Sequence, residues 1–414
     1  MSRIALLLFV AVTLNVSAEQ LSLDQAIAAA LEHNASVRNA RLEVEKAQTR
    51  IAAARTHRLP SFEMSMIGGE MLSNLSIEIE ETGERIDLGR SFNTIGIARI
   101  SQPVTQFHSI NLGIKLHEAA MAADKERERE ARLAVAREVK SAYFAVLSAR
   151  GYAEAMQESV TAWEEVEREM NVRVSQKAAL EADRLDASAR LASTRLAALS
   201  ANNTLATAKD QLNYLVGRPI DVVDDVGRAS ARLPEAVAPN RPDIREAELR
   251  VEQAKLDWKR KRAERIPDIA LTLTSATPFG NDRLPANMTS AGITMSYEPF
   301  TWGRREAELR EKRHAVEQAE NALRDKKSAA DVEIAARLRK VEESAAQIAV
   351  RRLESEAARE RLRVTKTRFQ QQAARLDEMF HANATLSQTA AREQEAISAY
   401  WIARADYEKA IGQE

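Results

Sequence analysis

Cysteine is absent from the 414 residues of this sequence, and glycine and proline are scarce, with 13 and 10 copies. The lack of cysteine excludes disulfide bonds, thiolate metal sites and a lipid-modified cysteine at a processed N-terminus. Glycine and proline make most tight turns, so a chain with few of them has few turns. The segments between those turns must therefore be long.

The sequence also lacks a dominant charge and a recognisable catalytic motif. Charged residues make up 29% of the chain and the net charge is −1, so no strong field attracts nucleic acid or an acidic substrate. There is no phosphate-binding loop, no HExxH and no GxGxxG. No two of the 6 histidines stand three or four residues apart, as metal ligands on a helix do. We therefore predict no enzyme activity, no cofactor, no metal site and no nucleic-acid partner.

The N-terminus has the parts of a secretory signal peptide. Arg3 supplies a positive charge, residues 4–12 form a short apolar core, and Val16-Ser17-Ala18 places small residues before a cleavage site. We predict a signal peptide at residues 1–18 and export of the chain. The alternative, a buried N-terminal helix, fits the abrupt change at Glu19-Gln20 less well. No other run reaches the roughly 18–20 apolar residues of a membrane helix, so any membrane crossing must use β-strands.

The rest of the chain repeats itself. When residues 36–62 are aligned with residues 243–269 without gaps, identical Arg, Ala, Leu, Val, Glu and Pro residues face each other. Further on, residues 209–217 parallel residues 404–412. Such agreement indicates an internal duplication. We predict a first repeat at residues 19–217, a linker with little regular structure at 218–240, and a second repeat at 241–414.

Each repeat has the same expected order of a helix, two strands and a long helical hairpin. The first helix is expected to begin near Ser22 and to end before Pro60. Four runs alternate apolar and polar residues, which is the strand pattern, and each can span a bilayer as a tilted strand. A soluble hairpin packed on a core is the alternative, and residues 73–90 are expected to be an extracellular loop. The predicted strands are about residues 61–72, 91–102, 268–278 and 288–298.

The segments after the strands are predicted to form coiled coils. Apolar residues recur at alternating intervals of three and four from Val139 to Val174, and only Glu167 breaks the pattern. The return segment, residues 187–215, has the same pattern, broken only by Thr194. This 3.5-residue repeat indicates a coiled coil, and at ~1.5 Å per residue the first arm would be roughly 100 Å long. The two hairpins are expected at about residues 109–215 and 304–411.

Four strands in one chain cannot close a barrel. An open sheet edge would leave backbone groups unsatisfied in hydrocarbon, at roughly several kcal/mol each, so other chains must complete the wall. Two chains would give eight strands around a filled interior, whereas three would give twelve strands and room for a lumen. We therefore predict a mainly α fold with a small membrane β part, built from a duplicated helix-strand-strand-long helical hairpin unit.

Several local motifs stand in a characteristic order: LSLDQAIAAALEHNASVRNARL from residue 21, NRPDIREAELRVEQA from residue 240, RIPDI after it, and the dipeptides Gln102-Pro103 and Glu298-Pro299. Their order resembles that of the TolC-like outer membrane efflux protein family over residues 20–412. The resemblance implies a homotrimer whose twelve-stranded β-barrel lies in outer-membrane lipid and continues as a periplasmic α-helical barrel.

The same resemblance implies a channel subunit of a tripartite efflux or type I secretion system in the outer membrane of a Gram-negative bacterium. Such a subunit conducts its cargo passively to the exterior from a periplasmic adaptor (membrane fusion) protein and an inner-membrane pump. Depending on the pump, the cargo of family members is a drug, a metal ion or a polypeptide.

The resemblance also places the turns of both hairpins at a periplasmic tip that docks the adaptor. Family members usually carry glycine in this turn, whereas this sequence has Ala178-Ala179 and Ala373-Ala374. The alternative is that the tip residues only close the coiled coils. The residues expected to touch the adaptor are Arg173, Val174, Ala178, Leu180, Arg368, Phe369, Ala374 and Leu376. Asp377 and Glu378 could line a closed tip and favour cations, or belong to a solvated face.

Two other protein classes compete with the channel. A periplasmic adaptor is also exported and carries a long helical hairpin, but it would have a single hairpin flanked by glycine-rich β domains. A structural coiled-coil protein would not need the four alternating strand runs. The duplication and the low glycine content favour the channel over both alternatives.

Overall fold

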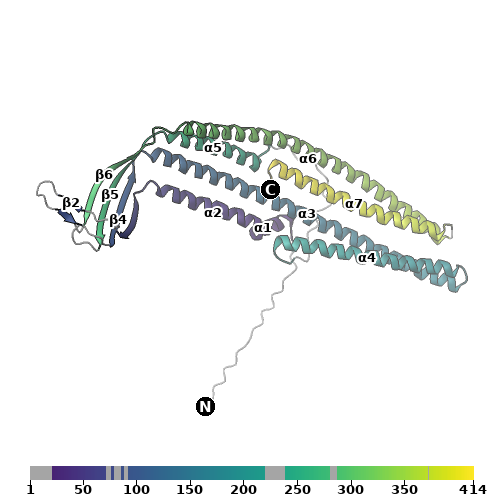
Figure 1. Cartoon of the computed structure of the whole chain (residues 1–414). Coiled ribbons are helices and arrows are strands. Elements are labelled where there is room, and N and C mark those ends of the chain that lie inside the picture. Colours follow the sequence, from purple (N-terminus) through teal and green to yellow (C-terminus); the bar gives the residue numbers. More distant parts are fainter. Residues whose placement is uncertain are drawn as a thin grey trace, which may run out of the picture. The chain divides into compact units, whose positions relative to one another are not determined.

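The structure, a computed structural model, describes residues 21–70, 76–78, 85–87, 92–219, 238–279, 287–371 and 373–414. The expected signal peptide and most of the expected linker lie outside these residues. The described part of the chain is mostly helical and contains a four-stranded antiparallel sheet and a short two-stranded one (Figure 1).

The predicted order of elements is confirmed in both repeats. The first repeat contains α1 (Leu23–His33), α2 (Ala35–Thr56), β1 (Ser61–Glu70), β4 (Phe92–Pro103), α3 (Phe107–Ser175) and α4 (Glu181–Val216). The second contains α5 (Pro242–Ala263), β5 (Asp268–Phe279), β6 (Met288–Ser296), α6 (Arg304–Gln370) and α7 (Leu376–Ile411). Inside the segment expected to be a loop, β2 (Ser76–Glu78) pairs with β3 (Arg85–Asp87).

The first helix differs from the prediction, because it is broken into α1 and α2 at Asn34. Asn34 has extended backbone angles, with φ −67° and ψ 127°, so it ends α1. Its side-chain Oδ1 then accepts a hydrogen bond of 2.8 Å from the Ser36 N–H at the start of α2. A short polar side chain that competes with the helical backbone explains the break.

The four-stranded sheet has the order β1-β4-β5-β6 and two chemically different faces. In one row of directly opposed residues, Phe62 faces Ile100, which faces Leu273. In the neighbouring row Glu63 faces Arg99, which faces Thr274. We define the apolar face by Phe62, Met64, Met66, Ile100, Ile269, Leu271, Leu273, Ile293 and Met295. The opposite, polar face contains Ser61, Glu63, Ser65, Arg99, Ser101, Asp268, Thr272, Thr274, Ser290 and Thr294.

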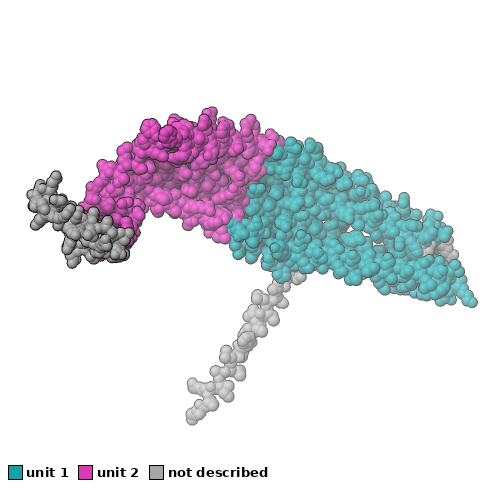
Figure 2. Space-filling view, in the orientation of Figure 1, with its two compact units in different colours: residues 1–39, 129–241, 329–414 teal, residues 40–128, 242–328 magenta. Residues whose placement is uncertain are grey.

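The chain divides into two compact units (Figure 2). Unit 2 comprises Ala40–Glu128 and Pro242–Ser328, and therefore holds the sheet, α2, α5 and the first parts of α3 and α6. Unit 1 comprises Met1–Asn39, Arg129–Arg241 and Ala329–Glu414, and holds α1, α4, α7 and the tips of both hairpins. A small core of Leu112, Ala119 and Leu256 joins α3 to α5 in unit 2.

The coiled-coil seam predicted for the first hairpin is confirmed inside unit 1. Its apolar members on α3 are buried as far as Met170, among them Val139, Met156 and Trp163, and so is Leu191 on α4. Glu167, the one charged seam position, accepts a hydrogen bond of 2.6 Å from the Ser188 hydroxyl, which explains how the seam tolerates it.

Candidate functional site

The candidate site consists of the two turns that join the arms of the hairpins, both in unit 1. In the first turn the Ala178 N–H donates to the Arg173 carbonyl at 2.8 Å, and the Lys177 N–H donates to the Val174 carbonyl at 2.9 Å. Lys177 has a φ of 56°, so the left-handed position of the turn is one residue before Ala178-Ala179. A residue with a Cβ is strained there, which is why a glycine would suit this turn.

The second helix of each hairpin begins with the same kind of hydrogen bond. The Leu180 N–H donates to the Asp183 carboxylate at 3.1 Å at the start of α4. The Arg375 N–H donates to the Glu378 carboxylate at 3.2 Å at the start of α7. Each carboxylate three residues into the helix thus satisfies a backbone donor that would otherwise be unpaired. Glu378 is therefore engaged as a cap.

The two hairpins contact each other close to their tips. The Arg173 guanidinium hydrogen-bonds to Glu169 and lies over the Phe369 ring, with its Cζ 4.6 Å from the ring centroid. A second link joins Lys366 Nζ and Glu165 Oε2 at 3.3 Å. A cation over an aromatic face is attractive, so Arg173 connects the end of α3 to the end of α6.

Phe369 is only 4% exposed and belongs to an apolar cluster shared by both hairpins. In the same cluster the Trp163 and Phe380 rings are 4.6 Å apart at their centroids, and Met379 is buried beside them. Within one chain, therefore, Phe369 anchors the second hairpin against the first and is not presented to solvent.

The remaining predicted tip residues differ in exposure. Leu180 is 71% exposed, and Ala178 and Arg368 are also exposed. Arg173, Val174 and Ala374 are half-buried. Leu376 begins α7, but its side chain lies outside the described part of the structure. Asp377 and Glu378 are exposed, and Asp377 Oδ1 lies 3.4 Å from Arg375 Nε.

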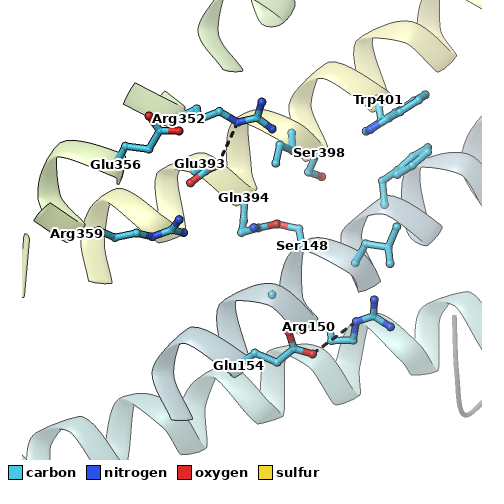
Figure 3. Close-up of a pocket in the computed structure, with 14 residues that line it drawn as sticks. Ser148, Arg150, Glu154, Arg352, Glu356, Arg359, Glu393, Gln394, Ser398 and Trp401 are labelled. Carbon is cyan, nitrogen blue, oxygen red and sulfur yellow. Dashed lines mark ion pairs between the residues drawn. The ribbon is translucent and has the colours of Figure 1, made fainter. Parts of the chain in front are cut away.

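A hollow of about 300 Å³ opens farther from the tips, between α3, α6 and α7 (Figure 3). Phe144 stacks on Trp401 at its lining, with ring centroids 4.9 Å apart. Its lining holds three arginines and three glutamates, among them the ion pairs of Arg150 with Glu154 at 3.8 Å and of Arg352 with Glu393 at 3.9 Å. The charges in the lining are balanced, so the hollow does not favour a ligand of one charge sign.

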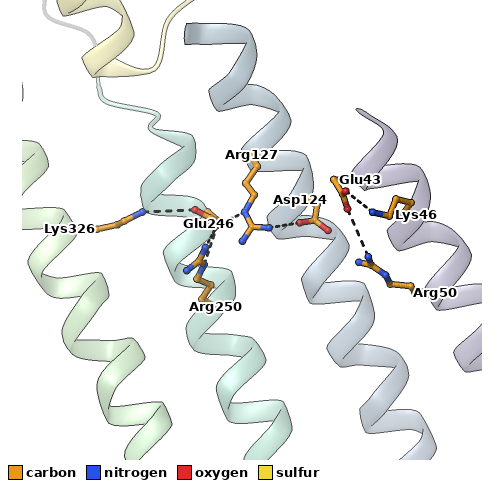
Figure 4. A network of polar contacts seen from close by, with 8 residues as sticks. All are labelled: Glu43, Lys46, Arg50, Asp124, Arg127, Glu246, Arg250 and Lys326. Carbon is orange, nitrogen blue, oxygen red and sulfur yellow. Dashed lines mark hydrogen bonds and ion pairs between the residues drawn. The ribbon is translucent and has the colours of Figure 1, made fainter. Parts of the chain in front are cut away.

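Sequence reasoning missed a buried carboxylate in unit 2. Glu246 on α5 is 5% exposed and accepts hydrogen bonds from Arg127 at 2.7 Å and Arg250 at 2.6 Å, while Lys326 lies 3.9 Å away (Figure 4). Burial raises the pKa of Glu246, but the hydrogen bonds and charges of Arg250 and Arg127 together hold its pKa below the ordinary value. No local motif marks this residue, because its partners come from three different helices.

Neither a metal site nor a membrane-spanning helix is found in the described ranges. No group of three or more His, Asp or Glu side chains there is placed to hold a metal ion. No helix among the described residues combines the length and the apolar character needed to cross a bilayer.

A family model described as "Outer membrane efflux protein" matches residues 26–218 and 233–413. The two matched segments cover nearly the whole described chain. A search of curated proteins finds no match to this sequence.

Several solved structures share the fold. The CmeC outer membrane channel of Campylobacter jejuni is 18% identical, with a TM-score of 0.76 over 94% of this chain and 85% of that one. The MtrE outer membrane channel of Neisseria gonorrhoeae, in its open state, is 22% identical, with a TM-score of 0.75 over 94% of this chain and 89% of that one. The outer membrane protein VceC of Vibrio cholerae is 18% identical, with a TM-score of 0.75 over 94% and 96%.

Proposed function

Because this chain belongs to the outer membrane efflux protein family, we propose that it is an outer-membrane channel subunit that passively conducts substrate to the exterior. Its cargo arrives from a periplasmic adaptor and an inner-membrane pump. One observation carries the proposal: the four-stranded sheet has an apolar face and two outer strands, β1 and β6, whose outer edges pair with no other described strand.

The apolar face supports a position in lipid. Phe62, Met64, Met66, Ile293 and Met295 are all more than half exposed on it. Apolar area in water costs about 25 cal/mol per Å², so such a contiguous patch on a soluble subunit would be unfavourable. Contact with acyl chains removes that cost and leaves the polar face toward a water-filled lumen.

The free edges support a homotrimer. Backbone N–H and C=O groups at the edges of β1 and β6 need partners inside a bilayer, where water is absent. Copies of the same chain supply them if β6 of one subunit pairs with β1 of the next. Three copies would close twelve strands around a lumen wide enough for cargo.

The hairpin tips are the proposed adaptor site. Leu180 is the largest exposed apolar side chain in the first turn, and hydrophobic side chains that project from a rigid turn are suited to insert into a partner. The full proposed contact set is Arg173, Val174, Ala178, Leu180, Arg368, Ala374 and Leu376, with Phe369 as the buried anchor beneath Arg173. Asp377 and Glu378 are proposed to line the closed tip of the lumen. Conduction of this kind requires no catalytic residue.

Single-channel recording in planar bilayers tests the function. The purified, folded oligomer is expected to give discrete conductance steps under an applied voltage alone. These steps should persist when no nucleotide and no ion gradient are present. A folded oligomer that inserts but never conducts would refute the proposal. Trimer-sized, heat-modifiable migration from the outer-membrane fraction is the expected companion result.

A further inference from the structure

A cationic hollow of about 580 Å³ lies between α2 and α3 in unit 2, close to the sheet. Arg55 and Arg58 line it from the end of α2, and His108 and Lys115 line it from the first turns of α3. Glu118 is the one carboxylate in the lining. The hollow therefore presents three permanent positive charges and a histidine against a single negative charge.

Two polar contacts hold the arginine side chains in place. Arg58 Nε donates to Asn111 Oδ1 at 2.9 Å, and Arg55 Nη2 donates to Glu118 Oε1 at 3.0 Å. Each contact occupies only part of a guanidinium group that carries five N–H donors. Lys115 is exposed on the same side of α3. The arrangement thus orients several cationic donors toward one space.

The hollow lies on the side of the helices that continues the apolar face of the sheet. Gln102, whose side chain belongs to the row of Leu271 on that face, donates from Nε2 to the Arg58 carbonyl at 3.0 Å. The opposite side of α3 carries Ser109 and Gly113, and Ser109 lines a hollow together with Asp268 of the polar face. His108 lines that second hollow as well, so it lies between the two sides of α3, which otherwise correspond to the two faces of the sheet.

Exposed apolar side chains stand in the chain between the strands and the cationic lining of the hollow. Leu59 stands three residues after the end of α2 and is 61% exposed. Phe107, the first residue of α3, is also exposed and stands four residues before Asn111, on the same helical side. The protein thus presents an apolar sheet face, then Leu59 and Phe107, and then cations. A membrane presents the matching order, from acyl chains through the interface to the headgroups.

We propose that this hollow, formed by Arg55, Arg58, His108 and Lys115, binds the phosphate group of a phospholipid in the periplasmic leaflet of the outer membrane. The inference rests on the proposed function, since it requires the apolar face to lie in lipid. Arginine forks bind phosphate oxygens through paired hydrogen bonds, and the exposed Lys115 adds a point charge. The bound lipid would fix the depth of each subunit in the membrane.

The test measures which lipids the full-length oligomer retains. The protein is purified from mixed micelles of phosphatidylglycerol and phosphatidylcholine, and the retained headgroups are counted by mass spectrometry. The R58Q/K115Q variant is expected to lose its enrichment in phosphatidylglycerol by roughly fivefold for each cation removed. The matched control, R50Q/R260Q, removes the same charge from the hollow on the opposite side of α3 and is expected to keep the enrichment.

The outcomes separate this inference from the proposed function. Equal lipid ratios in R58Q/K115Q and in R50Q/R260Q, from oligomers that still conduct in planar bilayers, would overturn the lipid site alone. Displacement of the lipid by inorganic phosphate at equal concentration would assign the hollow to the free ion instead. A wild-type chain that enters no membrane would overturn both the lipid site and the channel.

Discussion

At the scale of single residues, two buried serines on α6 have different hydrogen bonding. Ser344 Oγ donates to the Val341 carbonyl at 3.0 Å. Ser355 is fully buried, and its Oγ has no hydrogen-bond partner in the described chain. A buried hydroxyl without a partner keeps its desolvation cost, so Ser355 weakens the packing around this part of α6.

Replacing Ser355 with alanine is therefore expected to stabilise the protein by about 1 kcal/mol, because the unsatisfied hydroxyl is removed. Ser344→Ala is the matched control, and it is expected to give no such gain because it removes a satisfied hydroxyl. Both variants are compared by the apparent melting temperature of the detergent-purified oligomer. Equal shifts for the two variants would contradict the assignment.

Glu246 gives a prediction about acid stability. Its pKa in the folded chain lies below the ordinary value of 4.5, so its ionised form stabilises the folded state above that value. This stabilisation is lost as the pH falls through the lowered pKa. Glu246→Gln is expected to cost about 1–2 kcal/mol at neutral pH, an amount limited by the half-exposed arginine partners, and to flatten the fall in melting temperature below about pH 4.5.

The control for this experiment is Glu252→Gln, which changes an exposed carboxylate on the same helix. It is expected to leave both the melting temperature and its acid dependence close to those of the wild type. If E246Q and E252Q behave alike, the buried position of Glu246 has no special electrostatic role.

At the scale of elements, the hairpin tips combine an internal anchor with an exposed projection. Phe369 is buried against the first hairpin under Arg173, whereas Leu180 extends into solvent from the turn between α3 and α4. The anchor holds the two turns together, and the projection is free to meet a partner. Adaptor contact is therefore expected to depend on Leu180 without any loss of folding.

Leu180→Asp is expected to reduce capture of the periplasmic adaptor at least tenfold, since a charge would have to be desolvated on docking. Leu180→Met keeps the apolar volume and is the matched control. Site-specific cross-linking of the adaptor in cell envelopes measures the effect, and conductance of both variants in planar bilayers should equal that of the wild type. Undiminished cross-linking by L180D would remove Leu180 from the proposed contact set.

At the scale of the whole molecule, the absence of cysteine allows a clean test of the edge pairing between subunits. Ser65 on β1 is replaced by cysteine and combined in turn with cysteine at Ser290, Gly292 or Thr294 on β6. Facing residues of neighbouring strands come within about 5.5 Å, close enough for a disulfide. Oxidation of at least one pair is expected to give a covalent trimer on denaturing gels.

Ser65→Cys with Thr274→Cys is the matched negative control for the edge pairing. Thr274 lies on β5, which β4 separates from β1 within the same sheet. Neighbouring strands lie about 4.8 Å apart, so these two positions are too distant for a disulfide. A chain that remains monomeric in all three edge pairs would contradict the proposed homotrimer.

Sequence periodicity was sufficient to predict the duplicated order of elements and the seam of the first hairpin. Val139, Met156, Trp163 and Leu191 are buried as expected, because residues at alternating intervals of three and four share one side of a helix wherever that helix packs. Such patterns are local and need no knowledge of distant partners. The motif order alone likewise indicated the family.

Other features depended on contacts between segments that are far apart in the sequence. Alternation within one strand does not show which of its two sides joins the apolar face of the sheet, and the register puts Ile97 opposite Ser65 but Ile100 opposite Phe62, on different faces. Phe369 looked like a surface residue of a turn, yet Arg173 from the other repeat covers it. No sequence signal separates Glu246 from the other charges of α5, yet Arg127 pairs with it from another element.

The sequence by itself thus determined the order of the long helices and of the four strands of the main sheet, and which side of the first hairpin's helices is apolar. Only the tertiary structure decided which residues form the apolar face of the sheet, which tip residue anchors one hairpin to the other, and which charges are buried. The physical reason is that a periodic pattern reports the side of an element, whereas burial and register are set by whichever element packs against it.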